Sequence, residues 1–470
     1  MTESNLPARR GGPWVLLREA LAGGERDYTT ETIGRAVLLL AVPMVLEMLM
    51  ESVFAVTDMW FVARLGTDAV ATVGLTEAVI TIVYAVAVGL SMSATAMVAR
   101  RIGEKNKEGA AEAAVQAVGL GLLVSLLIGL PGAFFAGDLL RLMGGSPELV
   151  TAGQGYTRWM LAGNSTIMAI FMFNAVFRGA GDAALAMRVL WLANGLNMIL
   201  DPCLIFGWGP FPELGLTGAA VATTIGRGTG VAFQCWMLGR GKGSLRIRRP
   251  HLRLHTAVML RLVKVSLGGI GQYLIATASW VVLVRLVSTF GAAAVAGYTV
   301  AIRIILFVLM PSWGLANAAA TLVGQNLGAG RPDRAEASVW RTAWYNAGFL
   351  TLVAVVFIAW PRALVGIFTA EPEVLDLGAS CLRLVAYGYG FYAFGMVMTN
   401  AFNGAGNTMT PTVINFFCYW CFQIPLAWTL AHRTDFGAPG VYASITIAEV
   451  LMALVAMLVF RRGGWKKQEI

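Results

Sequence analysis

Apolar residues fill long stretches of this chain, and short polar segments separate them. Each stretch has about 20 to 30 residues, the length that an α-helix needs to cross the hydrocarbon core of a bilayer. The stretches lack the alternation of polar and apolar residues that membrane-spanning strands show. The pattern predicts twelve spanning helices, at residues 36–63, 68–98, 112–136, 150–177, 186–208, 216–239, 259–289, 293–322, 338–360, 376–402, 410–431 and 437–460.

The composition agrees with this prediction. Of the 470 residues, 57% are hydrophobic and only 13% are charged, whereas about a quarter of the residues of a soluble domain are charged. These values exclude a disordered chain, a nucleic-acid-binding module and an ordinary soluble enzyme. The sequence therefore predicts an all-α polytopic protein whose surrounding medium is the lipid bilayer.

Basic residues collect in every second loop and at the C-terminus, which explains the net charge of +9 without a nucleic-acid partner. By the positive-inside rule, both termini are then cytoplasmic. The first residues lack the apolar core and cleavage site of a signal peptide. The loop residues are Arg100, Arg101, Lys105, Lys107, Arg178, Arg188, Arg240, Lys242, Arg246, Arg248, Arg249, Arg253, Arg331, Arg334, Arg461, Arg462, Lys466 and Lys467.

The chain also repeats itself. Residues 66–182 align with residues 291–407 without a gap, at a shift of 225 positions, and glycines recur at matching places. The matched pairs include Gly89 with Gly314, Gly103 with Gly328, and Gly181 with Gly406. Six spans per repeat make the halves parallel, an arrangement that transporters use for alternating access.

The repeat and the basic loops together divide the chain into five segments. We expect a cytoplasmic N-terminal segment at 1–34, an N-lobe at 35–239, a basic cytoplasmic linker at 240–258, a C-lobe at 259–460 and a cytoplasmic tail at 461–470. The two lobes are predicted to be pseudo-symmetric bundles of six helices.

Two predicted helices carry polar stripes. Glu47, Glu51 and Asp58 fall on one face of the first helix, and Asn194, Asn197 and Asp201 fall on one face of the fifth. An ionisable group at the centre of a spanning helix costs about 2.5–3.5 kcal/mol and is by default a functional candidate. The stripes are absent from the second repeat, where Leu283 and Leu426 replace the two aspartates.

The chemistry of Asp58 and Asp201 points to ion exchange. Two carboxylates in a dry cavity do not both stay ionised cheaply, and a proton or a sodium ion can neutralise them. A cationic substrate would compete for the same role. Alternatively, either aspartate caps or hydrogen-bonds within the bundle, and Glu47 and Glu51 join helices instead of facing a cavity. Five further charged residues are interpreted as structural pairs or interface residues: Glu77, Arg227, Arg285, Arg303 and Glu449.

Cysteine and histidine chemistry adds little. Five cysteines do not make a disulfide framework. Cys418 and Cys421 form a C-x-x-C within an apolar helix, where two packed thiols are favoured over a redox pair. All three histidines fall in or near predicted loops, and His251 and His255 stand among arginines that would oppose a metal ion. No cofactor is expected.

Taken together, these motifs resemble the multidrug and toxic compound extrusion (MATE) family. The similarity rests on Pro43 with Asp58 fifteen residues later, on Gly-Ala-Gly-Asp at 179–182, on Asn197-x-x-x-Asp201-Pro202, and on Gly-Ala-Ala-Val-Ala-Thr ending at Thr223. The resemblance covers residues 30 to 460 and implies twelve helices in two lobes.

The resemblance also implies roles for individual residues. Asp58 looks like the family's coupling carboxylate, with Asn197 and Asp201 as its partners and with Tyr156 and Thr223 as further N-lobe ligands. Asn174 falls at a position that lines the drug cavity in similar proteins, and Glu51 stands where relatives often have a neutral polar residue. Ala276 and Tyr392 replace the acids of the branch that couples through its C-lobe, so the chain resembles the DinF-type branch.

These observations predict a secondary active antiporter in a bacterial inner membrane, acting as a monomer. It would export organic, cationic and aromatic compounds in exchange for H⁺ or Na⁺. Asp58, Asn197, Asp201 and Thr223 would hold a sodium ion, while Glu51, Asn174 and Asn194 would contact the substrate.

A lipid-linked saccharide flippase of the same superfamily is the alternative. The sequence shows no catalytic group of residues at membrane depth that would support an intramembrane enzyme, and no ring of residues that would support a selective passive channel. The coupling ion, the substrate and the resting conformation stay open.

Overall fold

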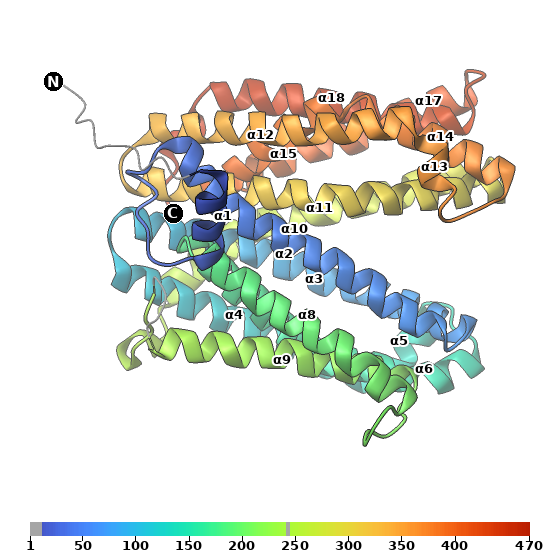
Figure 1. The fold of residues 1–470 in the computed structure, drawn as a ribbon, viewed down its shortest axis with the longest axis horizontal. Coiled ribbons are helices and arrows are strands. Elements are labelled where there is room, and N and C mark those ends of the chain that lie inside the picture. Colours follow the sequence, from blue (N-terminus) through green and yellow to red (C-terminus); the bar gives the residue numbers. More distant parts are fainter. Residues whose placement is uncertain (1–11, 241–244) are drawn as a thin grey trace.

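The computed structural model describes residues 12–240 and 245–470, and helices account for its architecture (Figure 1). Residues 1–11 of the predicted N-terminal segment and Lys242 of the predicted linker lie outside the described residues. No strand occurs in the part of the chain that the structure describes. The all-α prediction is therefore confirmed.

Each of the twelve predicted spans corresponds to a helix or to a broken helix. The first six are α2 (Ile33–Ala63), α3 (Thr67–Gly103), α4 (Lys107–Phe134), α6 with α7 (Pro147–Ala162 and Asn164–Gly179), α8 (Ala183–Phe206) and α9 (Leu216–Arg240). The last six are α10 (Thr256–Ser288), α11 (Ala292–Gly328), α12 (Pro332–Ala359), α14 with α15 (Pro372–Ala386 and Tyr389–Gly404), α16 to α17 (Met409–His432) and α18 (Ala438–Arg461).

Within the described residues, ten of these segments are long and apolar enough to cross a membrane by composition alone. The bent pair α14 and α15 makes an eleventh. The helix α9 has 25 residues, which is long enough, but it is rich in glycine and threonine and contains Arg227. Its low hydropathy reflects its contacts with other helices rather than with lipid.

Three predicted spans are not continuous α-helices, which corrects the sequence-based expectation. The fourth is interrupted at Gly163, and the tenth bends by 60° between α14 and α15. The eleventh contains a π-helical stretch, Phe416–Gln423, directly before Pro425. Because proline has no backbone N–H, the preceding turn cannot complete its α-helical ladder, and a wider turn accommodates the missing hydrogen bond.

The helices form two bundles of six, each around its own apolar cluster. Helices α2 to α9 make the N-lobe and helices α10 to α18 make the C-lobe. Short helices lie outside these spans: α1 (Pro13–Ala22), α5 (Ala136–Leu142), α13 (Pro361–Val365), and the single turns η1 (Arg249–Leu252) and η3 (Gly464–Lys467). One end of the molecule carries α1, the basic loops and the C-terminus, on the left in Figure 1. We refer to it as the basic end.

The lobes touch near the basic end through glycines that the repeat relates. A methyl group on Gly103 would overlap the carbonyl oxygen of Gln325, and one on Gly328 would overlap the carbonyl oxygen of Arg100. Residue 325 is the repeat counterpart of residue 100, and residue 328 is that of residue 103. The two contacts are therefore related by the pseudo-symmetry of the lobes. Helices that approach this closely need glycine at the crossing.

The same symmetry governs the next pair of crossings. Gly89 of α3 lies against Ile270 of α10, and Gly314 of α11 lies against Met44 and Val45 of α2. The glycine repeat in the sequence therefore encodes the backbone contacts that hold the lobes together.

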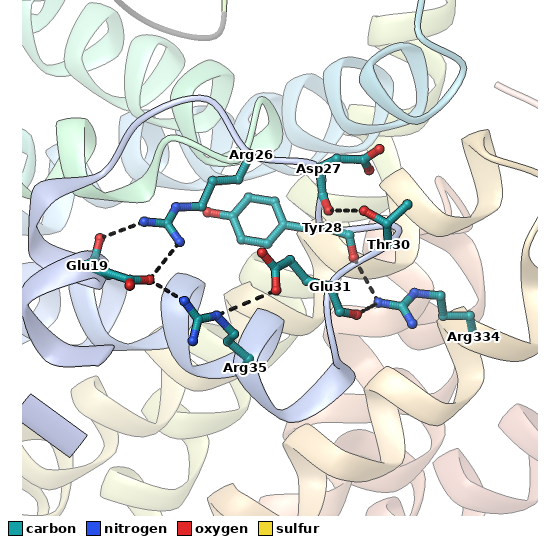
Figure 2. Close-up of polar contacts among 8 residues, drawn as sticks. All are labelled: Glu19, Arg26, Asp27, Tyr28, Thr30, Glu31, Arg35 and Arg334. Carbon is teal, nitrogen blue, oxygen red and sulfur yellow. Dashed lines mark hydrogen bonds and ion pairs between the residues drawn. The ribbon is translucent and has the colours of Figure 1, made fainter. Parts of the chain in front are cut away.

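The polar segment ahead of the first span is ordered and bridges both lobes. After α1, a strap of residues 23–32 runs across the basic end (Figure 2). The Tyr28 hydroxyl donates to the carbonyl oxygen of Gly181 in the N-lobe, at 3.0 Å. Arg334 of the C-lobe donates to the carbonyl oxygen of the same tyrosine, at 3.1 Å, and Arg331 donates to that of Thr29, at 2.7 Å. One residue of the strap thus joins the two lobes.

Candidate polar site in the N-lobe

The acidic face of α2 meets a different helix at each carboxylate. Glu47 lies one turn after Pro43, Glu51 lies one turn further, and Asp58 lies two turns beyond that. Their neighbours come from α7, α8 and α9, so α2 is the common wall of one extended polar cluster. The face predicted from the sequence therefore points into the N-lobe.

Glu47 anchors the first group of contacts. Its side chain is 1% exposed and accepts hydrogen bonds from Asn174 and from Arg178, each at 3.2 Å. Gln234 of α9 donates to the amide oxygen of Asn174, at 2.7 Å. A carboxylate at this depth is retained because Arg178 and the amide of Asn174 compensate for lost hydration, and Gln234 holds that amide in place. Glu47 thus joins α2, α7 and α9, while its second oxygen, Oε2, has no hydrogen-bond partner.

Glu51 lies beside the fifth span. It accepts a hydrogen bond from Asn194 at 2.9 Å. Nearby, the indole N–H of Trp191 donates to the carbonyl oxygen of Leu46, at 3.1 Å. Glu51 and Asn194, two of the residues assigned to the substrate, are therefore in direct contact. Asn174, the third, belongs to the Glu47 group one helical turn away.

Asn197, Asp201 and Thr223 form the second hydrogen-bonded group. With its amide nitrogen facing Asp201, Asn197 donates to both carboxylate oxygens, at 2.8 and 3.1 Å. Its amide oxygen then accepts from the hydroxyl and the backbone N–H of Thr223, at 2.9 and 3.0 Å. This orientation satisfies both ends of the amide, whereas the opposite one leaves its oxygen facing only acceptors. All three residues are buried, and Asp201 is fully enclosed.

Asp58 completes this group without a hydrogen bond. Its Oδ1 atom is buried and has no hydrogen-bond partner. Its charge interacts with those of Asp201 and Arg227. Tyr156, which is buried, also lies within electrostatic range of Asp58. The five residues predicted to bind the coupling ion therefore lie in one neighbourhood, although Asp58 and Asp201 are not directly hydrogen-bonded.

Arg227 of α9 is the residue that the sequence interpretation assigned differently. The sequence predicts a structural pair or interface residue here, and in the structure Arg227 donates a hydrogen bond to the hydroxyl of Tyr84, at 3.4 Å. Its Nη1 atom is buried without a partner, and its charge interacts with those of Glu51 and Asp58. A lone arginine in the middle of a span, opposite a helix with three acids, was the signal available in the sequence.

The donor set of the second group suits a small cation. Asp58 and Asp201 provide carboxylate oxygens and Thr223 provides a hydroxyl, which are the ligand types that hard cations prefer. The unpartnered Oδ1 atom of Asp58 is the acceptor available to a proton or an ion. Within the described residues, this group included, no three or more His, Cys, Asp or Glu residues are arranged to hold a metal ion.

The cysteines do not form a redox pair in this fold. Cys418 and Cys421 are both free thiols; Cys418 is buried and Cys421 is exposed. The prediction of two packed thiols is therefore right for Cys418 and wrong for Cys421, which lies on the outer face of the π-helical stretch.

Comparison with known proteins identifies the family. The MatE family model matches residues 43–203 and again residues 270–429, once in each lobe. The chain is 26% identical over 444 residues to "Probable multidrug resistance protein NorM" of Thermotoga maritima, covering 93% of this chain and 94% of that protein. It is 25% identical over 430 residues to "FAD transporter" of Shewanella oneidensis, covering 92% and 95%.

A solved structure supports the same conclusion. "Outward-facing conformation of a multidrug resistance MATE family transporter of the MOP superfamily" superimposes with a TM-score of 0.88 at 26% identity, covering 94% of this chain and 98% of that one. The helices, the duplication and the matched residues agree, and the chain belongs to the MatE family of membrane transporters.

Proposed function

We propose that this protein is a secondary active antiporter that exports organic cations in exchange for H⁺ or Na⁺, and that its N-lobe couples the two fluxes. The observation that carries this proposal is the buried Asp58 Oδ1 atom, which has no hydrogen-bond partner and whose carboxylate interacts electrostatically with Asp201 and Arg227. An acceptor buried without a donor costs free energy, which a bound proton or sodium ion would recover.

Arg227 can link ion binding at Asp58 to a change in the packing of the helices. When Asp58 is ionised, its charge attracts Arg227, so α2 is drawn toward α9. A proton or sodium ion at Asp58 removes that attraction and weakens the hold between the two helices. A ligand shifts a conformational equilibrium only by its differential affinity for the two states. Ion binding at Asp58 would meet this condition if the distance between Asp58 and Arg227 differs between the two states, because the bound ion changes the attraction between them.

The substrate side of the proposal rests on Glu51 and Asn194. They lie between the Glu47 group and the Asp58 group along α2, and Glu51 adds a negative charge that favours a cationic substrate. Asn174 would take part through its contact with Glu47. Methionines are numerous in the chain and suit a pocket that adapts to varied apolar ligands.

A second candidate substrate class is an anionic aromatic compound. Arg227 has a buried Nη1 atom without a partner, which would pair with a substrate phosphate or carboxylate. The similarity to a protein named as an FAD transporter supports this alternative. Transport assays with ethidium and with FAD, run side by side, would separate the two classes, and would also exclude a lipid-linked saccharide flippase if either is carried.

The remaining proposals concern orientation and classification. We propose a bacterial inner membrane, with the basic end on the cytoplasmic side and the protein acting as a monomer. Arginines and lysines concentrate at that end, as the positive-inside rule requires of cytoplasmic loops. Because the lobes contact each other near the basic end, the structure then represents an outward-facing state. Ala276 and Tyr392 leave the C-lobe without the second coupling acids, which supports a DinF-type assignment.

The decisive experiment reconstitutes the protein in liposomes with an imposed gradient of pH or of sodium. Wild-type protein should drive ethidium against its concentration gradient under one of these conditions, and Asp58→Asn should abolish the coupled movement. Glu449→Gln is the matched control, because Glu449 is a half-buried carboxylate of the C-lobe. Its Oε1 atom accepts a hydrogen bond from the Tyr419 hydroxyl, at 3.2 Å, while its Oε2 atom, like Asp58 Oδ1, has no hydrogen-bond partner. Full coupling in the Asp58→Asn protein would refute the mechanism.

A further inference from the structure

The repeat creates two related clefts at the basic end, one against the N-lobe and one between the two lobes. The first is lined by Leu39 of α2 and by Gly181 and Ala183 of the N-lobe. Shifted by 225 positions, these residues become Lys264, Gly406 and Thr408, and all three line the second cleft. We refer to the first as the filled cleft and to the second as the open cleft.

The filled cleft is occupied by the protein itself. The ring of Tyr28 from the strap lies directly on Gly181, where a methyl group would come within 2.7 Å of the ring. Tyr28 is 4% exposed, and its hydroxyl donates to the carbonyl oxygen of Gly181. The remaining cavity has a volume of about 10 Å³, which is roughly the space of one water molecule.

The open cleft, unlike the filled cleft, is not occupied by a side chain of the strap. Ile470 lies on Gly406 in the place that Tyr28 takes on Gly181, and Arg100 donates to the carbonyl oxygen of Gln468. These contacts cover one side only and leave a cavity of about 630 Å³. This volume falls within the range of small-molecule sites, about 300–1,000 Å³.

The two clefts also differ in charge. The open cleft is lined by four cations, Arg100 and Arg101 from α3 and Arg261 and Lys264 from α10, and by two acids, Glu104 and Glu469. The repeat counterparts of these four positions are all neutral, namely Gln325, Asn326, Ala36 and Leu39. The positive charge is therefore no consequence of the shared fold, because the same fold accommodates neutral residues at the related positions.

The open cleft has cations left over after its internal pairs are formed. Arg101 pairs with Glu104 at 2.8 Å. Arg261 and Lys264 lie one turn apart on α10, and neither forms an ion pair within the described residues. Both are exposed and line the cavity, so an anion entering the cleft would meet two cations without an ion-pair partner. The charges of Arg100 and Arg101 are partly offset by Glu104 and Glu469.

We propose that the open cleft binds a phosphate-bearing anion, and that this anion bridges the two lobes. Arginine and lysine side chains from separate elements, converging on a cavity, are the usual means of binding phosphate. Basic pockets between spanning helices bind anionic lipid headgroups. The phosphate would come from a phospholipid of the leaflet at the basic end or from a soluble phosphate compound. Because α3 and α10 belong to different lobes, the anion would favour the state in which they touch.

The test makes the open cleft resemble the filled one. The variant Arg261→Ala with Lys264→Leu places there the two residues that α2 has at the related positions, Ala36 and Leu39, of which Leu39 lines the filled cleft. The control, Arg246→Gln with Arg249→Gln, removes two exposed charges from the same end of the molecule but outside the cleft. Unfolding temperatures of all three proteins would verify that they are folded, since every substituted side chain is exposed.

The lipid arm uses nanodiscs that contain phosphatidylglycerol or only phosphatidylcholine, with bound lipid counted by native mass spectrometry after release. A basic residue near an anionic lipid contributes about fivefold in affinity. We therefore expect the cleft variant to bind phosphatidylglycerol about 25-fold more weakly than wild type, while the control variant loses less than about fivefold.

The soluble arm measures pyrophosphate binding by titration calorimetry in phosphatidylcholine nanodiscs. If pyrophosphate binds and the cleft variant weakens it, the phosphate comes from a soluble compound and the proposed site stands. If neither phosphatidylglycerol nor pyrophosphate distinguishes the cleft variant from the control, the proposal is wrong. Both readouts measure binding, so they do not depend on whether the antiport proposal holds.

Discussion

The two lobes share one scaffold but differ in what they bury. In the N-lobe, Glu47 accepts a hydrogen bond from Arg178, at 3.2 Å. At the related positions of the C-lobe, Gln272 donates to the amide oxygen of Asn403, at 2.9 Å. A charged pair and a neutral amide pair thus occupy the same place in the same fold. Asp58 likewise corresponds to Leu283, which is fully buried.

This difference separates what the fold requires from what the function requires. The C-lobe demonstrates that the six-helix bundle forms with amides and leucines at these positions. The acids and arginines of the N-lobe are therefore additions that cost stability, and such costs are commonly retained at functional sites. The asymmetry supports an N-lobe that binds ions and a C-lobe that serves mainly as a structural partner.

The largest expected effect comes from exchanging one pair for the other. Arg178→Asn alone leaves Glu47 buried without its cation, which should lower the free energy of unfolding by about 3–5 kcal/mol. Adding Glu47→Gln recreates the amide pair of the C-lobe and should restore most of that loss. Thermal unfolding in detergent of the two single variants and the double variant measures the coupling. Equal instability in the double and single variants would mean that the lobes differ in more than this pair.

The next effect tests the opposite exchange. Leu283→Asp places an acid where the C-lobe has an apolar side chain, and we expect a loss of about 2.5–3.5 kcal/mol. The reciprocal change, Asp58→Leu, removes an unpartnered carboxylate but also the charge that attracts Arg227, so we expect a small change in unfolding temperature together with the loss of coupled transport. If Asp58→Leu were strongly destabilising, Asp58 would be a structural residue rather than an ion site.

A smaller effect concerns the filled cleft. Tyr28→Phe keeps the ring on Gly181 but removes the hydroxyl, so we expect a loss of about 1 kcal/mol, the net value of one hydrogen bond. Exchange of backbone amides in residues 25–32 should become faster by about fivefold, which hydrogen–deuterium exchange would measure. Tyr345→Phe provides a control, because it removes a tyrosine hydroxyl from the same apolar cluster outside the strap. Unchanged exchange in the strap would show that the ring alone fixes the segment.

The smallest effect is a pH dependence of the same segment. The hydrogen bond from Arg26, with the charges of Arg35 and Arg26, holds the pKa of Glu19 below its usual value. The stabilisation is therefore present above the unfolded-state pKa of about 4.3 and is lost as the pH falls through the lower folded-state value. Between pH 6 and pH 3, the wild-type strap should loosen more than that of Glu19→Gln. Identical pH profiles would exclude Glu19 as the titrating group.

The sequence was sufficient for the architecture because the relevant signals are local and repeated. Apolar length predicted the spans, and matched glycines such as Gly103 and Gly328 revealed the duplication. Residues on one face of a helix, such as Glu51 and Asp58, were also predictable, since helical periodicity alone places them. These features need no knowledge of which helices touch.

What the sequence did not provide depends on contacts between distant segments. The role of Arg227 follows from the approach of α9 to α2, and nothing near Arg227 in the sequence indicates that approach. The strap was expected to be a polar terminal segment, because its ordering comes from Gly181, Arg331 and Arg334, which lie far along the chain. The charge difference between the two clefts became visible only when the cavities had been located.

The crossing of Gly103 with Gly328 has a consequence for the speed of transport. When two helices pack with interdigitated side chains, each side chain must leave the space between its neighbours before the helices can separate. Each such step requires a change of rotamer and adds to the energy barrier. Here the two helices contact each other through backbone atoms at Gly103 and Gly328, so they can separate without any change of side-chain rotamer at these positions. The rate of the change between the two orientations would then depend on the few hydrogen bonds between the lobes at this end of the molecule. Substitutions that strengthen or remove those hydrogen bonds would lower or raise the turnover rate.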